Sequence, residues 1–516
     1  MARNARRLSL LTLVLMFALA ACGSQTPQTP AAADPSAPPA AVEPTAVAAA
    51  PTAVTIEPTA IAPEPVTLKV MNWSQEQAEF YQEAAAAFQQ EYPHITVQWD
   101  TLAQDQYRET LPLMFQSGDA PDIFFWIGRN RVLTMAELVD QGWVAPLAPA
   151  DADLTEWQTR WPEGSFVEGI NMQDGQIYSF PFNDNKIWGP GYMFINRTVY
   201  RAAGLDPDAP PTTWSELLET CRTIKASSEA YCLAVPLKGN HLQRTWYPLA
   251  GSIMTDSFFD LKNGRFAIDD PRMLEAFDFL QTFYQEDLVV PGINDHTFAR
   301  QAMATGQAAI YFDGAWMPGV FDQMGFGDLD LGVAAPPYPD SGERGALGQT
   351  LSENKFYVSS ASEHPEAAWL FLEWMTRPAG FFAQEYLKRG FGTLGYADNA
   401  ALISDPAMLE VAKIADELRV MLPEPAIACP DVGQSKAYLN AEAIRKDWEW
   451  EAMVEALTTG ADFAPVAAEI ATAKNAMFQQ TLAEEQAAGL DVSPACYTFA
   501  DWNYGQPFNT SGYVSR

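Results

Sequence analysis

Three tryptophans each follow a short apolar run of the sequence. Trp73 ends the run that begins at Val66, Trp126 ends DIFFW, and Trp316 follows AAIYF and an Asp-Gly break. A large ring at the end of a strand can offer a flat surface to a ligand, or it can pack beneath a loop as core. Because ligands of open α/β sheets bind outside the carboxyl ends of strands, we expect the three rings to line a shared cleft. For each ring, packing under a loop is the alternative.

The elements that carry the first two tryptophans alternate between strand and helix patterns. VTLKVMNW and HITVQW alternate in hydrophobicity like strands, and Phe80, Ala84 and Phe88 recur one helical turn apart between them. DIFFW is a continuous apolar run, which is typical of a strand covered on both faces. Strands that alternate with helices predict parallel strands joined by crossovers, and therefore an α/β lobe.

The composition of the chain limits the kinds of partner that it can bind. The chain has 516 residues, 48% of them hydrophobic, which is enough for two domains of ordinary size. Its formal net charge is −34. A phosphate backbone or an anionic membrane surface would repel such a charge, so we expect no nucleic-acid partner.

The N-terminus, MARNARRLSLLTLVLMFALAACGS, has the form of a secretory signal, which we assign to residues 1–21. Its apolar run is too short for a membrane span. The tetrapeptide LAAC resembles the lipobox of bacterial lipoproteins, which implies that Cys22 becomes the first mature residue and carries a lipid. Plain cleavage beside a chance cysteine is the alternative. Residues 22–65 are rich in Pro, Ala and Thr, and we expect a disordered, semi-extended linker there.

Four cysteines remain after Cys22, and an even number in an exported chain favours disulfides over a metal site. Three pairings are open, and sequence proximity favours Cys221–Cys232, which leaves Cys429–Cys496. There is no CxxC, and the four histidines are scattered, so we expect no metal. GxSxG, HExxH, P-loop and Rossmann glycine motifs are also absent, so we expect no catalytic residue and no cofactor.

Seven motifs, in order, make the chain resemble the extracellular solute-binding proteins of the maltose-binding-protein type, which serve carbohydrate ABC importers. These motifs are FQQEYPHITVQW, YRETLPLMFQSGDAPDIFFW, DGQIYSFPFNDN, YMFINRTVY, PPTTWSELLETC, FARQAMATGQAAIYFDGAW and SEHPEAAWLFLEWMT. The likeness covers residues 66–390. RGFGTLGY lacks the proline of the family pattern, and residues 398–516 match only weakly.

The resemblance implies an α/β, two-lobed periplasmic-binding-protein-like (type II) fold with a hinge and an interlobe ligand cleft. The N-terminal lobe would hold residues 66–183 and 348–390. The C-terminal lobe would hold residues 184–347 and 391–516. The crossing near 182–185 would be part of the hinge.

The resemblance also implies where a ligand binds. A sugar needs flat rings to stack on and fixed polar groups for its hydroxyls, and unpaired buried groups of such a site would reject other ligands. Trp126 matches a position where the family often has an N-lobe aromatic, Trp316 matches the main stacking aromatic of the other lobe, and Trp246 matches a lid aromatic. The remaining implied ligand-binding residues are Trp73, Ser74, Gln75, Asp184, Asn185 and, by rough position only, Tyr438.

Simpler roles stay open for several of these residues. Asp184 could pair with Lys186 or cap a turn, and Trp246 could be core. Arg129 and Arg244 could bind an anionic ligand, although we expect each of them to form a surface ion pair.

The function that the resemblance implies is the capture of a small solute, preferably a mono- or oligosaccharide, by closure of two lobes. The solute would pass to the permease subunits of an ABC importer. We expect a monomer, lipid-anchored on the outer face of the cytoplasmic membrane or periplasmic. The alternatives are a cell-surface enzyme of the glycoside hydrolase kind, and a binder of a polyol or a glycerol phosphodiester.

Overall fold

The structure of the chain is a computed structural model. The chain divides into two compact units, Met1–Ala62 and Pro63–Arg516, and all of the described residues belong to the second unit. They are residues 64–126, 135–183, 191–251, 258–292, 294–342, 347–349, 356–445, 447–504, 506 and 508. The predicted signal peptide, Cys22 and nearly all of the predicted linker lie outside the described residues.

The first sheet has five strands in the order β2-β1-β3-β14-β4. Strand β1 runs parallel to β2 and β3, as the alternation of strands and helices predicts. Strand β14 runs antiparallel to β3 and β4, so the chain returns to this sheet after building a second one. The strands are β1 (Val66–Asn72), β2 (Ile95–Thr101), β3 (Ile123–Phe125), β4 (Val144–Ala145) and β14 (Phe356–Ser359).

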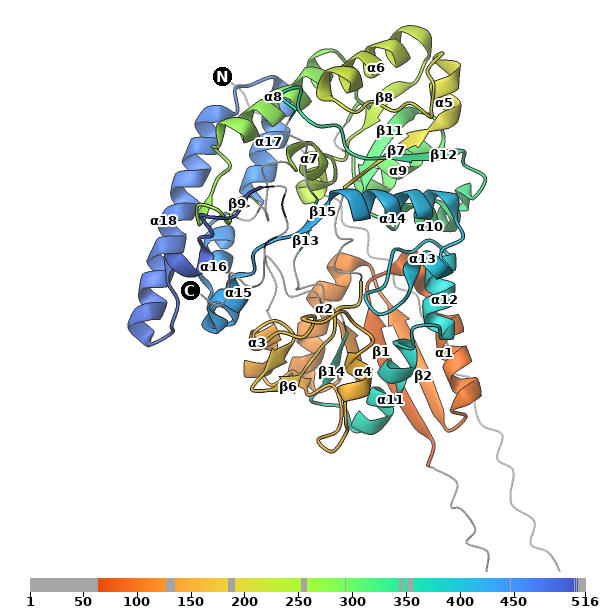
Figure 1. The fold of residues 1–516 in the computed structure, drawn as a ribbon, viewed down its shortest axis with the longest axis vertical. Coiled ribbons are helices and arrows are strands. Elements are labelled where there is room, and N and C mark those ends of the chain that lie inside the picture. The colour runs from red at the N-terminus through yellow and green to blue at the C-terminus, as the bar shows by residue number, and fades with distance from the viewer. Residues whose placement is uncertain are drawn as a thin grey trace, which may run out of the picture. The chain divides into compact units, whose positions relative to one another are not determined.

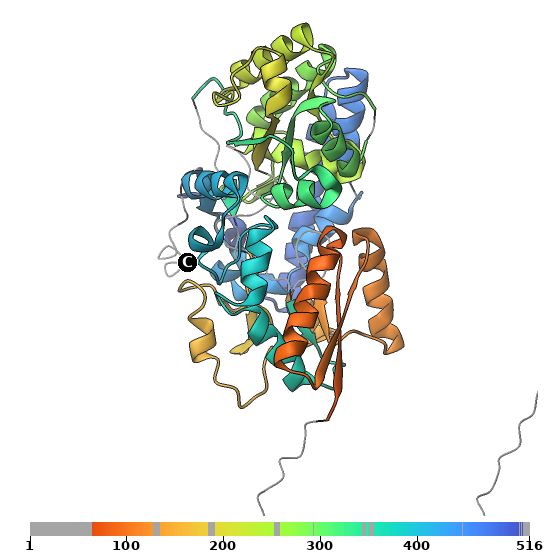
Figure 2. The same cartoon turned by 90° about the vertical axis from the view of Figure 1, so that its right-hand side faces the viewer.

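Helices of this part pack through the apolar stripe that the sequence predicts. Phe80, Ala84 and Phe88 of α1 are all fully buried, because residues three or four positions apart lie on one helix face. Figure 2 shows α1 and α2 in orange beside strands β1 and β2, which Figure 1 labels. The helices are α1 (Ala78–Glu91), α2 (Gln104–Ser117), α3 (Met135–Asp140), α4 (Thr155–Gln158), α11 (Pro365–Met375) and α12 (Phe381–Lys388).

The second sheet has four strands in the order β12-β7-β11-β8, with β12 at one end. Strand β7 runs antiparallel to β11 and β12, and β8 runs parallel to β11. Every residue of β7 and β11 is buried, as continuous apolar strands in the middle of a covered sheet must be. The strands are β7 (Tyr192–Asn196), β8 (Tyr231–Ala234), β11 (Ala308–Asp313) and β12 (Leu331–Ala334).

The helices around the second sheet are fixed by local caps and by one disulfide. Helix α6 begins after Thr213, which forms a capping box with Glu216. The same helix is joined to β8 by the disulfide between Cys221 and Cys232. The helices are α5 (Arg197–Ala202), α6 (Trp214–Ser227), α7 (Gln243–Ala250), α8 (Pro271–Gln285), α9 (His296–Ala304) and α10 (Met317–Phe321).

The last part of the chain is mainly helical. Helix α18 packs against α16 and α17, and its buried Lys474 Nζ lies 2.8 Å from carboxylate oxygens of Glu442 and Glu449. The elements are α13 (Asn399–Leu402), α14 (Pro406–Leu418), β15 (Arg419–Met421), α15 (Pro425–Ala428), α16 (Ala437–Ala443), α17 (Trp448–Thr459) and α18 (Ala464–Ala488). Short strands elsewhere are β5 (Met172–Gln173), β6 (Gln176–Ile177), β9 (Phe259–Asp260), β10 (Arg265–Phe266) and β13 (Leu347–Gln349).

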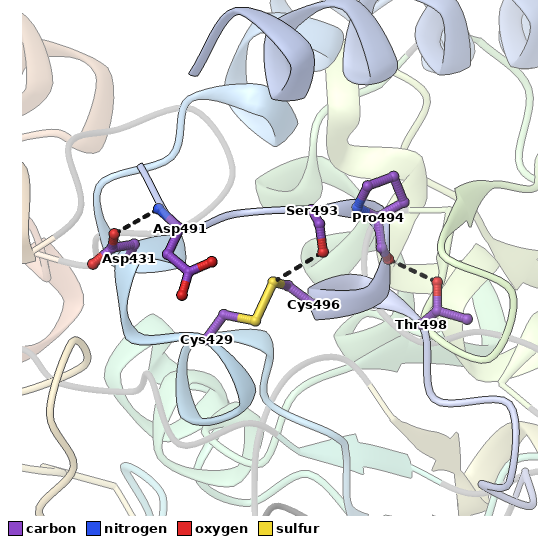
Figure 3. The surroundings of a disulfide bond; sticks show 7 residues. All are labelled: Cys429, Asp431, Asp491, Ser493, Pro494, Cys496 and Thr498. Carbon is purple, nitrogen blue, oxygen red and sulfur yellow. Dashed lines mark hydrogen bonds between the residues drawn. A yellow bond between two sulfur atoms is a disulfide. The ribbon is translucent and has the colours of Figure 1, made fainter. Parts of the chain in front are cut away.

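A second disulfide, between Cys429 and Cys496, ties the C-terminal tail to the loop after α15 (Figure 3). Beside it, the Asp491 N–H donates a hydrogen bond of 2.8 Å to the Asp431 carboxylate. Both bridges have the pairing that sequence proximity favours. The tail aromatics then join a third apolar cluster, in which Phe499, Trp502 and Phe508 are buried.

Candidate ligand-binding site

Trp316 lies just beyond the end of strand β11, as the sequence predicts. Its indole ring is half-buried and folds back over Gly314. A Cβ atom at Gly314 would lie only 2.2 Å from the ring, so no larger residue fits under the tryptophan in this arrangement. The Asp-Gly break therefore has a steric reason: the glycine gives the ring a place at the strand end.

The residue that ends β11, Asp313, is a fully buried carboxylate with several partners. Its Oδ2 atom accepts hydrogen bonds from Arg300 Nη2 at 3.0 Å and from the Tyr311 hydroxyl at 2.7 Å. Its Oδ1 atom accepts from the Gly314 N–H at 2.8 Å, and Arg244 Nε lies 3.4 Å away. Burial opposes the charge, but Arg300 and Arg244 hold the pKa of Asp313 below its usual value.

Arg300 also reaches toward the first sheet. Its Nη1 atom lies 3.5 Å from the Glu76 carboxylate. Glu76 belongs to a short 3-10 helix (Gln75–Gln77) that begins shortly after β1 ends. The ends of β1 and β11 are thus linked by an ion pair, which brings the two strand ends with Trp73 and Trp316 into one region.

Two histidines adjoin this charged cluster. The Nδ1 atoms of His241 and His296 are 3.2 Å apart. Burial and the nearby positive charges of Arg244 and Arg300 lower the pKa of His296 to about 3. At neutral pH the imidazole of His296 is therefore uncharged, and the charges near Trp316 come from the arginines and carboxylates.

On the first sheet, Trp73 is half-buried against the edges of neighbouring rings. Its centroid lies 4.4 Å from that of Phe125 and 5.4 Å from that of Tyr107, and the Arg108 guanidinium lies 5.5 Å from the indole centroid. Ser74, which comes next in the chain, is half-buried, and Gln75 is exposed. A ligand contact of these three side chains stays a prediction.

Three predicted site residues lie in apolar clusters instead. Trp126 is 3% exposed and packs with Tyr107 and the residues around β3. Trp246 is fully buried in the cluster of the second sheet. Tyr438 packs on the rings of Phe259 and Phe266 in the third cluster. Trp126 and Trp246 thus have core roles, whereas Tyr438 is half-buried beside its cluster. A ligand contact at these three positions stays a prediction.

The two predicted polar residues of the crossing, Asp184 and Asn185, lie outside the described residues, as do Lys186 and Arg129. Arg244 is not a surface ion pair, because its partner Asp313 is fully buried. Sequence reasoning missed Arg300 and Glu76 entirely. The only signal in the sequence was Asp313, an acidic residue at the end of an otherwise apolar strand. A carboxylate that is buried there needs a cation beside it.

Within the described ranges, no group of three or more His, Cys, Asp or Glu side chains could hold a metal ion. No helix of the same ranges is long and apolar enough to cross a membrane.

Residues 72–380 match the family of bacterial extracellular solute-binding proteins, and the chain belongs to this family. It is thus an exported protein that binds a solute, of a family defined by binding rather than by catalysis. A Brucella abortus relative is 25% identical over 367 residues, 67% of this chain and 82% of its own length. An uncharacterized ABC transporter extracellular-binding protein of Pyrococcus horikoshii is 24% identical over 321 residues, 58% of this chain and 66% of its own.

The similarity to solved structures extends over nearly the whole length of each of those structures. The GacH receptor of Streptomyces glaucescens superposes with a TM-score of 0.61 at 17% identity, over 80% of this chain and 98% of that one. An ABC substrate-binding protein of Listeria monocytogenes in complex with cycloalternan gives 0.58 at 15% identity, over 80% and 99%. These likenesses confirm the two-lobed, type II α/β fold that the family resemblance implies.

Proposed function

We propose that the protein captures a mono- or oligosaccharide between its two lobes and delivers it to the permease of an ABC importer. The observation that carries this proposal is the half-buried ring of Trp316, placed by Gly314 at the end of β11. A partly exposed indole offers the flat apolar face on which a sugar ring stacks.

The charged groups beside the ring supply the second part of the site. Arg244 and the exposed Glu76 would offer a donor and an acceptor for hydroxyl groups, while the buried Arg300 holds Glu76 and Asp313 in place. Trp73, Ser74 and Gln75 would contribute from the first sheet, and Asp184 and Asn185 from the crossing. Known relatives of the same fold support a sugar, since the GacH receptor was solved with acarbose and RafE with raffinose.

We assign residues 66–183 and 348–390 to the N-terminal lobe, and residues 184–347 and 391–516 to the C-terminal lobe. The return of β14 to the first sheet supports this division. Closure about the crossings would then bury the solute. We expect one chain to suffice, so the protein would act as a monomer.

A thermal-shift screen of the folded chain tests the solute class. It should include mono- and oligosaccharides, polyols and glycerol phosphodiesters. A solute at 100 times its dissociation constant should stabilise the protein by about 2.7 kcal/mol. Stabilisation by sugars alone supports the proposal, whereas stabilisation by a polyol or phosphodiester alone contradicts it. Release of shortened sugar products during incubation would favour the enzyme alternative.

The membrane anchor is a separate proposal. Cys22 follows the lipobox-like LAA and precedes a Pro-rich spacer, so we propose that it carries the lipid that holds the protein at the membrane. Expression of Cys22→Ser should release the protein from the membrane fraction or block its processing. If the variant fractionates with membranes as the wild type does, the lipid assignment is wrong.

A further inference from the structure

A groove of about 600 Å³ lies beside strand β12 at the end of the second sheet. One wall is β12 itself with Ala335 and Pro336. A second wall is the loop that carries Pro207, Pro210 and Pro211, and a third is helix α14. The volume is in the range of sites that hold a small molecule or a short peptide.

The ladder between β12 and β7 fixes which backbone groups of β12 face this groove. The Arg197 N–H donates to the Asp330 carbonyl at 3.0 Å, and Leu331 pairs with Asn196 in the antiparallel register. In such a ladder, hydrogen-bonded and non-hydrogen-bonded pairs alternate. Residues 330, 332 and 334 therefore bond to β7, while the peptide groups of Leu331, Val333 and Ala335 point away from it.

These outward groups form an open sheet edge inside the groove. Among the described residues, none of the backbone hydrogen bonds outside the helices and ladders uses Val333 or Ala335. An open edge is a template for an added strand, because its donors and acceptors repeat with the period of an extended chain. The backbone of the groove thus selects an extended peptide rather than a helix.

The walls add a charge preference. Ala407, Glu410, Ile414 and Glu417 recur at helical spacing, so they form one face of α14 toward the groove. In the described part of the lining, Asp208 pairs with Arg197 and Glu410 pairs with Lys413 Nζ at 3.1 Å, which leaves Glu417 as a carboxylate beyond these pairs. An extended segment that carries Lys or Arg side chains complements this charge.

We propose that the groove binds an extended, basic peptide segment of a partner protein, which adds as a strand to β12. Main-chain hydrogen bonds to Val333 and Ala335 would hold the segment, and Glu417 would favour a basic side chain on it. This surface is separate from the residues around Trp316, and it does not depend on which solute the protein binds.

The probe is a blocked octapeptide of alternating Lys and Val, titrated into the folded chain by calorimetry at low salt. Two copies serve as controls: one N-methylated at every residue, which keeps the charge but donates no main-chain hydrogen bond, and one with Glu in place of Lys. We expect the Lys peptide to bind, the methylated copy to bind at least about tenfold more weakly, and the Glu copy not to bind.

Two variants of the chain complete the test. Val333→Pro removes the outward N–H without touching a β7 hydrogen bond, and Val333→Ala keeps it. The Val333→Pro variant should bind the Lys peptide about tenfold more weakly than the Val333→Ala variant does. Absence of binding, or equal binding by the methylated copy or by both variants, would overturn the proposal, since simple attraction to an acidic protein then explains the data. If Val333→Pro fails to fold, the methylated peptide alone decides.

Discussion

Arg300 on α9 and Glu76 after β1 form an ion pair of 3.5 Å that links the ends of two different sheets. The two partners differ in environment: the Arg300 side chain is 6% exposed and the Glu76 side chain is 42% exposed. Arg300 also holds the buried Asp313 at 3.0 Å. The same guanidinium therefore forms one solvent-screened ion pair, with Glu76 near the first sheet, and one buried ion pair, with Asp313 at the end of the second sheet.

The two ion pairs of Arg300 should differ in their effect on stability. Glu76→Gln removes a partly exposed partner, so the free energy of unfolding should fall by less than about 1 kcal/mol. Asp313→Asn leaves Arg300 and Arg244 without their buried counter-ion and should cost about 3–5 kcal/mol. Urea denaturation without solute measures both. Equal losses for the two variants would contradict this picture of the cluster.

Stability should decline as the pH falls through the range in which His296 titrates. Burial and the positive charges of Arg244 and Arg300 lower its folded-state pKa to about 3, while the unfolded side chain has a pKa of about 6.5. Between these values the unfolded state binds more protons, so the stability is fully present above about pH 6.5 and is lost as the pH falls toward 3.

Denaturation at pH 7, 6 and 5 checks this expectation. His296 alone could contribute up to about 1.4 kcal/mol of loss per pH unit in this window. The variant His296→Gln, which cannot gain the proton, should show a smaller slope. The pKa of Asp313 is lowered instead, because Arg300 and Arg244 outweigh its burial. Its contribution therefore disappears only below about pH 3.9. If the stability of His296→Gln falls with pH as steeply as that of the wild type, the role of His296 is refuted.

Trp316 should matter for binding more than for folding. Its ring is half-buried in this structure, so Trp316→Ala should have little effect on melting. The same substitution should weaken the binding of the sugar found by the screen by about 1.5–3 kcal/mol, which is a loss of affinity of roughly tenfold to a hundredfold. The matched control Trp246→Ala removes a fully buried ring and should cost about 3–5 kcal/mol of stability. A large stability loss with unchanged affinity for Trp316→Ala would end the stacking proposal.

The two disulfides should contribute unequally. Cys429 and Cys496 are separated by 67 positions in the sequence, and Cys221 and Cys232 by 11. In the chain-entropy model the stabilisation grows from about 3 kcal/mol for a 15-residue loop to about 4.7 for 100 residues. Replacing both cysteines of the longer loop by Ala should therefore lower the free energy of unfolding more than the same change in the shorter loop. A larger loss from the shorter loop would count against the model.

Local pattern was enough to predict the start of the fold. Alternating hydrophobicity located β1 and β2, and the spacing of Phe80, Ala84 and Phe88 identified the buried face of α1. The same pattern could not show that β7 runs antiparallel to β11, because strand direction in a sheet depends on connections distant in the sequence. The two-lobed architecture came from the family resemblance, not from periodicity.

The site was harder to predict for a physical reason. A tryptophan at a strand end looks the same in sequence whether it faces a ligand or a core, so the half-buried Trp316 and the buried Trp126 could not be told apart. The partners of Asp313 come from α7 and α9, and Glu76 comes from the other sheet. Such contacts exist only once the chain has folded.

The position of β14 between β3 and β4 has a consequence for the timing of synthesis. Strand β3 cannot gain its second neighbour until about 230 further residues have been made, which takes about 12–46 s at 5–20 residues per second. A chain that folded as it left the ribosome would hold the apolar edge of β3 open for that whole interval, and open strand edges recruit other chains. An exported chain that stays unfolded until synthesis is complete avoids the delay, because β3, β14 and β4 then become available together. The strand order thus favours folding after translocation over folding during translation.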